Sequence, residues 1–297
     1  MKRIGIDLGG TKIEGVILDT DDRILARERV GTPQSDGYTA ILEILVSLIG
    51  QLQRASGSDC RVGIGTPGAI STRTGLMRNS NTVCLNDRPL KQDIEARLGY
   101  GVRLANDANC FALSESRNGA ARGYPTCFGI IMGTGVGGGI VVGNSLHAGT
   151  MHIGGEWGHN PLEQTGPACY CGRNGCVETL LSGPGMSRDH HKHGGEADTD
   201  PETIVRLADA GDAIAMETVE RYLTRFGRAV ATVINILDPH AVVLGGGMSN
   251  IDLLYTRGRD MIEPHIFSDF YSTPILRNQH GDSSGVLGAA QLWQAGE

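Results

Sequence analysis

Two glycine-rich segments of this chain resemble each other, and that likeness constrains the fold more than any other feature of the sequence. The segments are IGIDLGGTKIEGVI, residues 4–17, and FGIIMGTGVGGGIV, residues 128–141. Each is typical of an apolar strand, a glycine-rich turn and a second apolar strand. The matching glycines are Gly5 with Gly129, Gly9 with Gly133, and Gly15 with Gly139. An internal duplication is the simplest explanation, although two unrelated glycine hairpins would also look alike.

The rest of the chain alternates between strand and helix patterns. Predicted helices lie at residues 38–56, 90–98 and 213–237, directly after Asp107, after the N-cap Asp200, and from Ser283 or Ser284 to the end. Predicted strands lie at residues 61–68, 102–107 and 241–247. We therefore expect an α/β protein of two lobes. The smaller lobe is expected to hold residues 1–110 plus a closing helix at 284–297, and the larger lobe residues 111–283.

The charge balance limits the possible partners. With 33 acidic and 26 basic residues, the chain has a formal net charge of -7. That balance argues against a nucleic-acid-binding protein, because phosphate contacts need clustered Lys and Arg. The N-terminus enters a strand pattern at once, and no stretch of about 18 apolar residues follows. We expect a cytoplasmic protein that has no membrane partner.

Three glycine turns, at residues 9–12, 133–139 and 245–247, are candidate phosphate-binding sites. Backbone N–H groups can converge on an anion there because no side chain blocks the approach. Gly133, Gly135 and Gly138 satisfy GxGxxG, but a strand pattern follows where a dinucleotide fold needs a helix. Asp7 and Lys12 flank the first turn, and a carboxylate beside a phosphate requires a cation between them. Asp7 is therefore expected near Mg²⁺, unless it is an ordinary strand-end aspartate.

A histidine and three cysteines lie within 18 residues of one another. They are His159, Cys169, Cys171 and Cys176. In a reducing cytoplasm, such a group is more plausible as a metal site than as disulfides. One histidine and three cysteines form a closed, structural zinc set. The alternative is that these thiols bind no metal.

Six ordered motifs together resemble the ROK sugar kinases, which belong to the actin/hexokinase-like ATPase superfamily. The motifs are IGIDLGGTK, LANDANCFALSE, IMGTGVGGGIVVGN, GEWGHNPL, CYCGRNGCVE and VVLGGGMSN, and the likeness runs over residues 4–293. GEWGHNPL, NSN and HGDSSGVLGAA look most similar to bacterial fructokinase/mannokinase, with N-acetylglucosamine kinases further away. The resemblance implies a two-lobed, RNase H-like fold with a cleft between the lobes, ATP and Mg²⁺ as cofactors, and a homodimer.

The resemblance also implies the site residues. Asp107 matches the catalytic base of the family, although it could merely cap the helix that follows. The implied sugar contacts are Gly68, Asn81, Asn106, Asp107, Glu156, His159 and Glu178. The implied ATP contacts are Asp7, Gly9, Gly10, Thr11, Lys12, Gly133, Thr134, Gly135, Gly246 and Gly247. With zinc on one ring nitrogen, His159 could donate to a sugar hydroxyl with the other.

The expected activity is ATP-dependent phosphorylation of a hexose hydroxyl, with D-fructose converted to fructose 6-phosphate and mannose as the second substrate. An N-acetylglucosamine kinase or a glucokinase of the same family is the alternative. Position 69 is alanine where some relatives have a larger polar residue, which leaves the sugar preference open. A sugar-sensing regulator without catalysis is a further alternative, but intact Asp7, Lys12 and Asp107 favour the enzyme.

Overall fold

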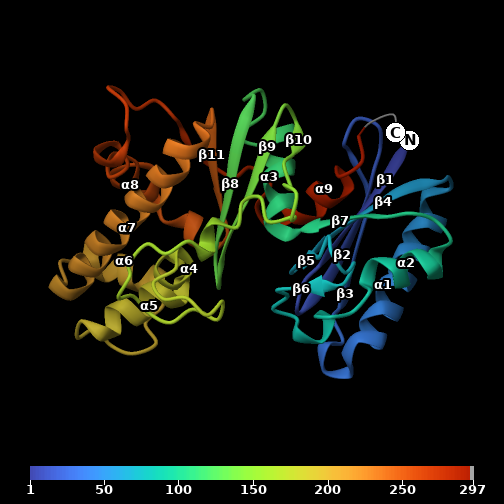
Figure 1. Ribbon diagram of the computed structural model, residues 1–297, viewed down its shortest axis with the longest axis horizontal. Helices are drawn as coiled ribbons and strands as arrows, with labels where there is room; N and C mark the ends of the chain where they lie inside the picture. Colours follow the sequence, from blue (N-terminus) through green and yellow to red (C-terminus); the bar gives the residue numbers. More distant parts are fainter. Residues whose placement is uncertain (295–297) are drawn as a thin grey trace.

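The computed structural model describes residues 1–294, and it contains two five-stranded sheets with the same topology (Figure 1). The first sheet has the order β3 (Ile24–Gly31), β2 (Lys12–Leu18), β1 (Lys2–Leu8), β4 (Cys60–Thr66) and β7 (Arg103–Asn106). The second has the order β10 (Ser145–Leu146), β9 (Val136–Val142), β8 (Thr126–Met132), β11 (Ala241–Gly245) and β12 (Ile275–Arg277). In each sheet, the first three strands of this order pair antiparallel with one another, and the last two strands run parallel to the third. The repeated topology agrees with an internal duplication.

The two glycine hairpins differ in the length of their turns. Ile6 pairs with Gly15, whereas Ile130, at the matching place in the second hairpin, pairs with Gly138. The second turn is therefore one residue shorter than the first. The structural counterpart of Gly15 is Gly138, so the predicted match to Gly139 is wrong by one residue.

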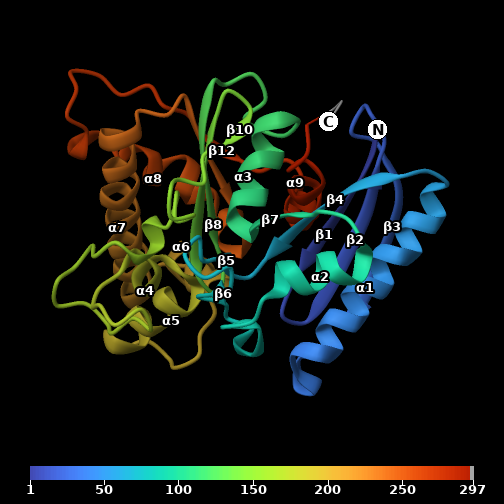
Figure 2. The same ribbon diagram turned by 45° about the vertical axis from the view of Figure 1, so that its right-hand side comes forward.

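Helices cover both faces of each sheet. Helices α1 (Gly37–Ser56) and α2 (Leu90–Leu98) lie on the outer side of the first lobe, while α3 (Asp107–Arg117) and α9 (Ser284–Ala290) lie between the two sheets (Figures 1 and 2). The second lobe also contains α4 (Val177–Leu181), α5 (Gly183–Lys192), α6 (Pro201–Asp209), α7 (Ala213–Leu237) and α8 (Arg257–Asp260). A short hairpin, β5 (Ala69–Ile70) and β6 (Met77–Arg78), projects from the first sheet toward the second lobe.

Each lobe has its own apolar core. Leu45, Leu48 and Leu52 of α1 are buried against the first sheet, as the helical spacing of residues 38–56 predicts. Phe128 of β8 and Phe226 of α7 are both buried in the second core. These two cores are the main source of stability for the two lobes.

Glycines allow α3 and α9 to approach their neighbours closely. A Cβ on Gly63 of β4 would lie 1.9 Å from the carbonyl oxygen of Ala289 in α9. A Cβ on Gly288 would lie 1.7 Å from the carbonyl oxygen of Cys110 in α3. Because neither contact leaves room for a side chain, α9 packs backbone to backbone against both the first sheet and α3.

The expected boundaries differ from the structure in detail. The boundary expected near residue 110 lies inside α3, and the helix expected at 284–297 ends at Ala290. After it, Trp293 Nε1 donates to the carbonyl of Val62 at 2.8 Å. Residues 295–297 of that expected helix lie outside the described residues. No helix within residues 1–294 is long and apolar enough to cross a membrane.

Candidate active site

Asp107 stands where β7 ends and α3 begins. The helix N-cap is Asn106, whose Oδ1 accepts from Ala108 N at 2.9 Å. Asp107 Oδ1 accepts from the same N–H at 2.7 Å, so it is not the residue that caps the helix. Asp107 is open to solvent on one side, yet partial desolvation by the surrounding protein raises its pKa to about 6. The hydrogen bond from Ala108 N opposes this rise, and the charge of Glu156 adds to it. The dipole of α3 therefore does not hold this pKa low, but the carboxyl is still mostly ionised at pH 7.

Asp7, near the end of β1, is the second carboxylate in this region. Burial, with smaller contributions from the charges of Asp107 and Glu14, raises its pKa to about 7 against the opposing charge of Lys12. A Cβ on Gly285 of α9 would lie 3.1 Å from Asp7 Oδ2, so α9 forms a wall beside it. Two neighbouring carboxylates that repel each other are a donor set suited to a hard divalent cation such as Mg²⁺.

Two more carboxylates extend this group into the second lobe. Glu156 precedes the 3-10 helix Trp157–His159, and Glu178 lies on α4. Burial raises the pKa of Glu156, the charges of His159 and Arg78 oppose the rise, and Glu178 adds to it. Glu178 Oε2 accepts from Val136 N at 3.1 Å, which fixes its carboxylate beside the 133–135 turn. The charge of Glu178 thus acts on the pKa of Glu156, and the charge of Glu156 acts on the pKa of Asp107.

The first lobe contributes Gly68 and Asn81. Thr66 Oγ1 donates to the carbonyl of Gly68 at 2.8 Å and to that of Ala105 at 3.2 Å, which joins the Gly68 turn to the strand that carries Asn106. Asn81 is exposed and lies beside Thr82, whose Oγ1 would be 3.6 Å from a Cβ on Gly10. The structure therefore places Gly68 near Asn106, and Asn81 beside the 9–12 turn.

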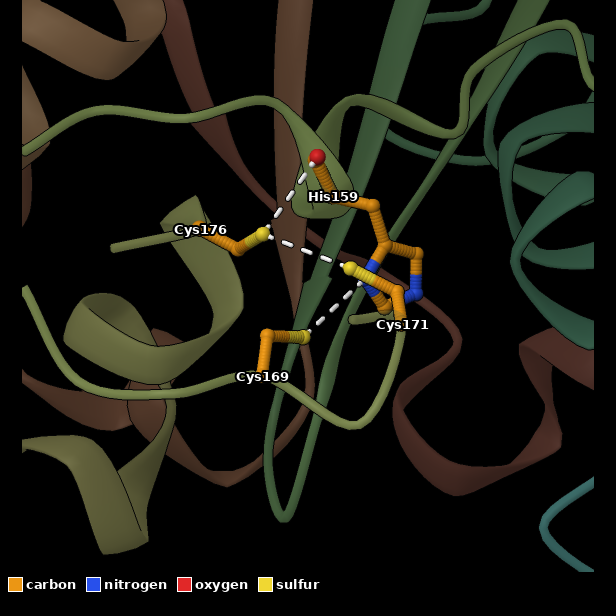
Figure 3. Close-up of side chains that lie close together, drawn as sticks. All are labelled: His159, Cys169, Cys171 and Cys176. Carbon is orange, nitrogen blue, oxygen red and sulfur yellow. Dashed lines mark hydrogen bonds between the residues drawn. The ribbon is translucent and has the colours of Figure 1, made fainter. Parts of the chain in front are cut away.

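The four predicted metal ligands come together in one cluster (Figure 3). His159 ends a 3-10 helix, Cys176 is the N-cap of α4, and Cys169 and Cys171 lie in the turn between them. Their ligand atoms all lie within 4.8 Å of one another. The cluster is held by the bonds from Cys169 N to Arg173 O at 2.8 Å and from Gly172 N to Cys169 O at 3.0 Å.

The distances within the cluster fit a tetrahedral zinc ion. With Zn–S bonds of about 2.3 Å, the sulfurs of a tetrahedral site lie about 3.8 Å apart. The observed Sγ–Sγ distance is 3.6 Å for Cys171 and Cys176, and Cys169 Sγ lies 3.6 Å from His159 Nδ1. The residues present therefore suit zinc in number, type and spacing.

Tyr170 stands on the other side of the histidine ring. Its hydroxyl lies 3.0 Å from His159 Nε2, the nitrogen expected to face a sugar hydroxyl. The two rings meet edge to face at 86°, and 75% of Tyr170 is exposed. A cavity of about 770 Å³ is lined by Glu156, His159 and Tyr170 of the second lobe together with Asn79 of the first. Asp107 does not line this cavity.

A larger cavity lies at the glycine turns of the second sheet. β8 and β11 are parallel neighbours, so the turns that follow them lie side by side. Gly246 has φ +76°, and a Cβ there would lie 2.4 Å from the carbonyl oxygen of Met132. Gly133, Thr134 and Gly247 line a cavity of about 1300 Å³. Gly135 and Gly246 lie next to these residues but do not line it, and the 9–12 turn belongs to the first lobe.

The sequence analysis missed some residues that lie at the site. Gly183, Pro184 and Gly185, at the start of α5, line the large cavity, and Gly183 N donates to Gly133 O at 2.8 Å. The SGPG stretch that contains them could have been recognised as a helix start, because Ser182 is its N-cap. Tyr170 and Arg78 could not have been identified, since their contacts depend on the tertiary fold.

Comparisons with known proteins agree with this geometry. The sequence model of the ROK family matches residues 3–296. An N-acetyl-D-glucosamine kinase of Haemophilus influenzae is 37% identical over 300 residues, which cover 97% of this chain and 98% of the relative. The same enzyme of Photobacterium profundum is 38% identical over 299 residues, with the same coverage of each chain.

Solved structures give the same architecture. A ROK hexokinase from Thermus thermophilus matches with a TM-score of 0.89 at 34% identity, covering 98% of this chain and 97% of that chain. A ROK family glucokinase from Streptomyces griseus, in complex with glucose and AMPPNP, matches with a TM-score of 0.80 at 29% identity, covering 98% and 99% of the two chains.

Proposed function

The chain belongs to the ROK family of sugar kinases, and we propose that it transfers the γ-phosphoryl group of ATP to N-acetyl-D-glucosamine. ATP-dependent phosphorylation of a sugar is the activity of the ROK kinases it resembles over its whole length. The sugar is the proposed part. The curated relatives described above are N-acetyl-D-glucosamine kinases, which favours that alternative over the fructose and mannose expected from the motifs.

The observation that carries the catalytic proposal is the Asp107 carboxylate, ionised at pH 7 but with a pKa raised to about 6. A base whose pKa lies just below the working pH is ionised and still accepts a proton readily. Asp107 takes the proton of the sugar hydroxyl while the hydroxyl oxygen bonds to the γ-phosphorus. The bond between that phosphorus and the bridging oxygen of ADP then breaks, and ADP leaves with its electron pair. Glu156, His159, Glu178, Gly68, Asn81 and Asn106 are proposed to orient the sugar.

We assign the nucleotide to the large cavity of the second lobe. Gly133, Thr134 and Gly247 line it with backbone that can reach phosphate oxygens. The 9–12 turn of the first lobe, with Lys12, is proposed to meet the terminal phosphates from the opposite side. Bound Mg²⁺ would neutralise the phosphate charge that faces Asp7. Asp7 would supply a carboxylate oxygen to hold the ion.

We further propose that His159, Cys169, Cys171 and Cys176 hold structural zinc. Zinc supplies rigidity to a turn-rich segment that contains little regular structure. His159 uses Nδ1, the nitrogen beside Cys169. Its Nε2 then carries the proton, which it donates to the Tyr170 hydroxyl or to a sugar hydroxyl. Thus the cluster fixes the tautomer and orientation of a sugar-binding side chain.

The lobes are assigned as residues 1–110 with α9, and residues 111–283. We also propose a homodimer. On the second lobe, 82% of Ile236 and all of Phe267 are exposed, and apolar side chains of this size are commonly covered in an assembly. Sedimentation at twice the chain mass of 31.5 kDa would support it, and a monomer at all concentrations would exclude it.

An ADP-release assay with saturating Mg-ATP tests the activity. N-acetyl-D-glucosamine, D-fructose, D-mannose and D-glucose should be compared by kcat/KM. We expect the first to give the highest value. A higher kcat/KM for D-fructose would instead identify a fructokinase. ADP release with none of the four, together with sugar binding detected by Trp157 fluorescence, would instead identify a sugar-sensing protein without catalysis.

A further inference from the structure

A loop that leads to Glu156 is tied across the lobe boundary by Arg78. The loop covers residues 147–155, between β10 and the 3-10 helix Trp157–His159. Arg78 Nη2 donates to the main-chain carbonyl of Met151, at the tip of this loop, with a distance of 2.6 Å. Arg78 belongs to β6 of the first lobe. The hydrogen bond therefore joins the two lobes five residues before a proposed sugar ligand.

The tip of the loop is only weakly held by its own lobe. Met151 is 57% exposed and Ile153 is 41% exposed, so neither apolar side chain anchors the tip. Within the loop, Gly154 N donates to Ala148 O at 2.9 Å and His152 N to Gly149 O at 3.3 Å. These bonds close the tip on itself. The ends of the loop are held by β9 of the same lobe, because His147 N donates to Ile140 O at 2.8 Å and a Cβ on Gly155 would lie 2.4 Å from the carbonyl oxygen of Gly138. Ile153 of the tip lines the same cavity as Glu156 and His159, and its placement consequently depends on the contact with Arg78.

Arg78 is itself fixed within the wall of the sugar site. Its backbone pairs with Ala69 in the β5–β6 hairpin. A Cβ on Gly68, a proposed sugar contact, would lie 2.6 Å from the Arg78 carbonyl oxygen. Arg78 Nε is shielded from solvent and has no acceptor within residues 1–294, so the Nη2 bond defines the direction of the guanidinium group. One residue thus backs Gly68 with its main chain and reaches Met151 with its side chain.

We propose that Arg78 is a positioning residue of the sugar site, which holds the tip of the 147–155 loop, and with it the cavity wall at Ile153, against the first lobe. This inference rests on the proposed function, since it assumes that Glu156 binds the sugar. A charge-assisted hydrogen bond to a carbonyl is stronger than a neutral one and keeps its direction. Without it, the loop tip that lines the cavity beside Glu156 must be ordered anew each time a sugar binds, which weakens sugar binding but not nucleotide binding.

Steady-state kinetics of Arg78→Met, compared with Arg78→Lys and Arg73→Met, test this proposal. Arg73 lies in the exposed turn of the same hairpin and serves as the matched control. Arg78→Met is expected to raise KM for the sugar about tenfold or more, from the strength of one charged hydrogen bond. KM for ATP and the melting temperature should stay near wild type. Arg78→Lys keeps a cationic donor and should give a smaller rise, while Arg73→Met should give none.

The outcomes separate this inference from the proposed function. Wild-type protein that phosphorylates none of the four sugars overturns both. An active wild type with an unchanged sugar KM in Arg78→Met overturns the role of Arg78 alone. Equal rises in both KM values with a lower melting temperature also overturn it, because they indicate general destabilisation. If Arg78→Met does not fold, Arg78→Lys decides between these outcomes, with Trp157 fluorescence as an independent measure of sugar affinity.

Discussion

Replacement of Asp107 by Asn should make the protein less active and more stable. The wild-type side chain has its pKa raised from 3.8 to about 6 by the surrounding protein. Above pH 6, the folded state therefore holds an ionised carboxylate that it stabilises less well than water does. At about 1.4 kcal/mol per pKa unit, the cost is about 3 kcal/mol before solvent is considered. Because the side chain is open to solvent, screening leaves about 1 kcal/mol.

Asn keeps the oxygen that accepts from Ala108 N but carries no charge. The gain in stability should be fully present above pH 6 and absent below pH 4, where the carboxyl is protonated in both the folded and the unfolded chain. In a chain of this length, about 1 kcal/mol corresponds to a melting temperature about 2 °C higher. Calorimetry at pH 8 and at pH 4 would measure the difference.

The same change should reduce kcat by roughly 10²- to 10⁴-fold, because the sugar hydroxyl loses its general base. In the wild type, kcat/KM should fall about tenfold between pH 7 and pH 5, as a group with a pKa of about 6 becomes protonated. The Asn variant should lose this dependence. Asp212→Asn, at the N-cap of α7, is the matched control and should leave kcat unchanged. Near-normal turnover in Asp107→Asn, or a lower melting temperature at pH 8, would refute the reasoning.

Three further changes test other parts of the structure. Cys176→Ser should remove zinc, as measured by elemental analysis against about one ion per wild-type chain, whereas Cys84→Ser should keep it; a metal-free wild type would contradict the zinc proposal. Glu115→Gln should lower the melting temperature by several degrees. The Glu115 carboxylate is fully buried and accepts from the backbone N–H groups of Ala120, Gln279 and His280, and in the variant a side-chain NH₂ group would face some of these donors. Gly63→Ala should destabilise the fold by about 1–3 kcal/mol, since its methyl group would collide with the Ala289 carbonyl, and an unchanged denaturation midpoint would disprove that close contact.

Local patterns in the sequence predicted the features that depend on neighbouring residues. The helical face of α1 follows from the spacing of its leucines, and Asp200 accepts from Thr203 N at the start of α6, as its place before a proline predicts. The four ligands of the metal cluster lie within 18 residues, so the turn between them limits how far apart they can lie. In these cases, the residues are close in the sequence, so the short chain between them limits their distances whatever the tertiary fold.

Features that depend on distant residues could not be predicted in this way. Arg78 and Met151 are 73 residues apart, and no periodicity relates them. The raised pKa of Asp107 was not foreseen either, because the helix start alone favours the ionised form. Its rise depends on the tertiary fold, which partly desolvates the carboxyl group and brings Glu156 of the other lobe near it. The ungapped match of the two hairpins was wrong by one residue because sequence similarity does not show the length of a turn.

In both sheets, candidate ligand-binding residues lie at or beyond the carboxyl ends of parallel strands. In the first sheet, Asp7 and Asp107 lie at or just beyond the carboxyl ends of the parallel strands β1 and β7, and in the second, Gly133 and Gly246 follow the parallel strands β8 and β11. Ligands of open α/β sheets bind beyond such ends. The matched hairpins differ in charge there, since Ile131 stands in the second where Asp7 stands in the first. A neutral turn can bind phosphate without repulsion, while the acidic half would supply the proposed base and the proposed metal ligand. On that proposal, divergence of two similar halves would explain why the reacting groups meet between the lobes rather than within either one.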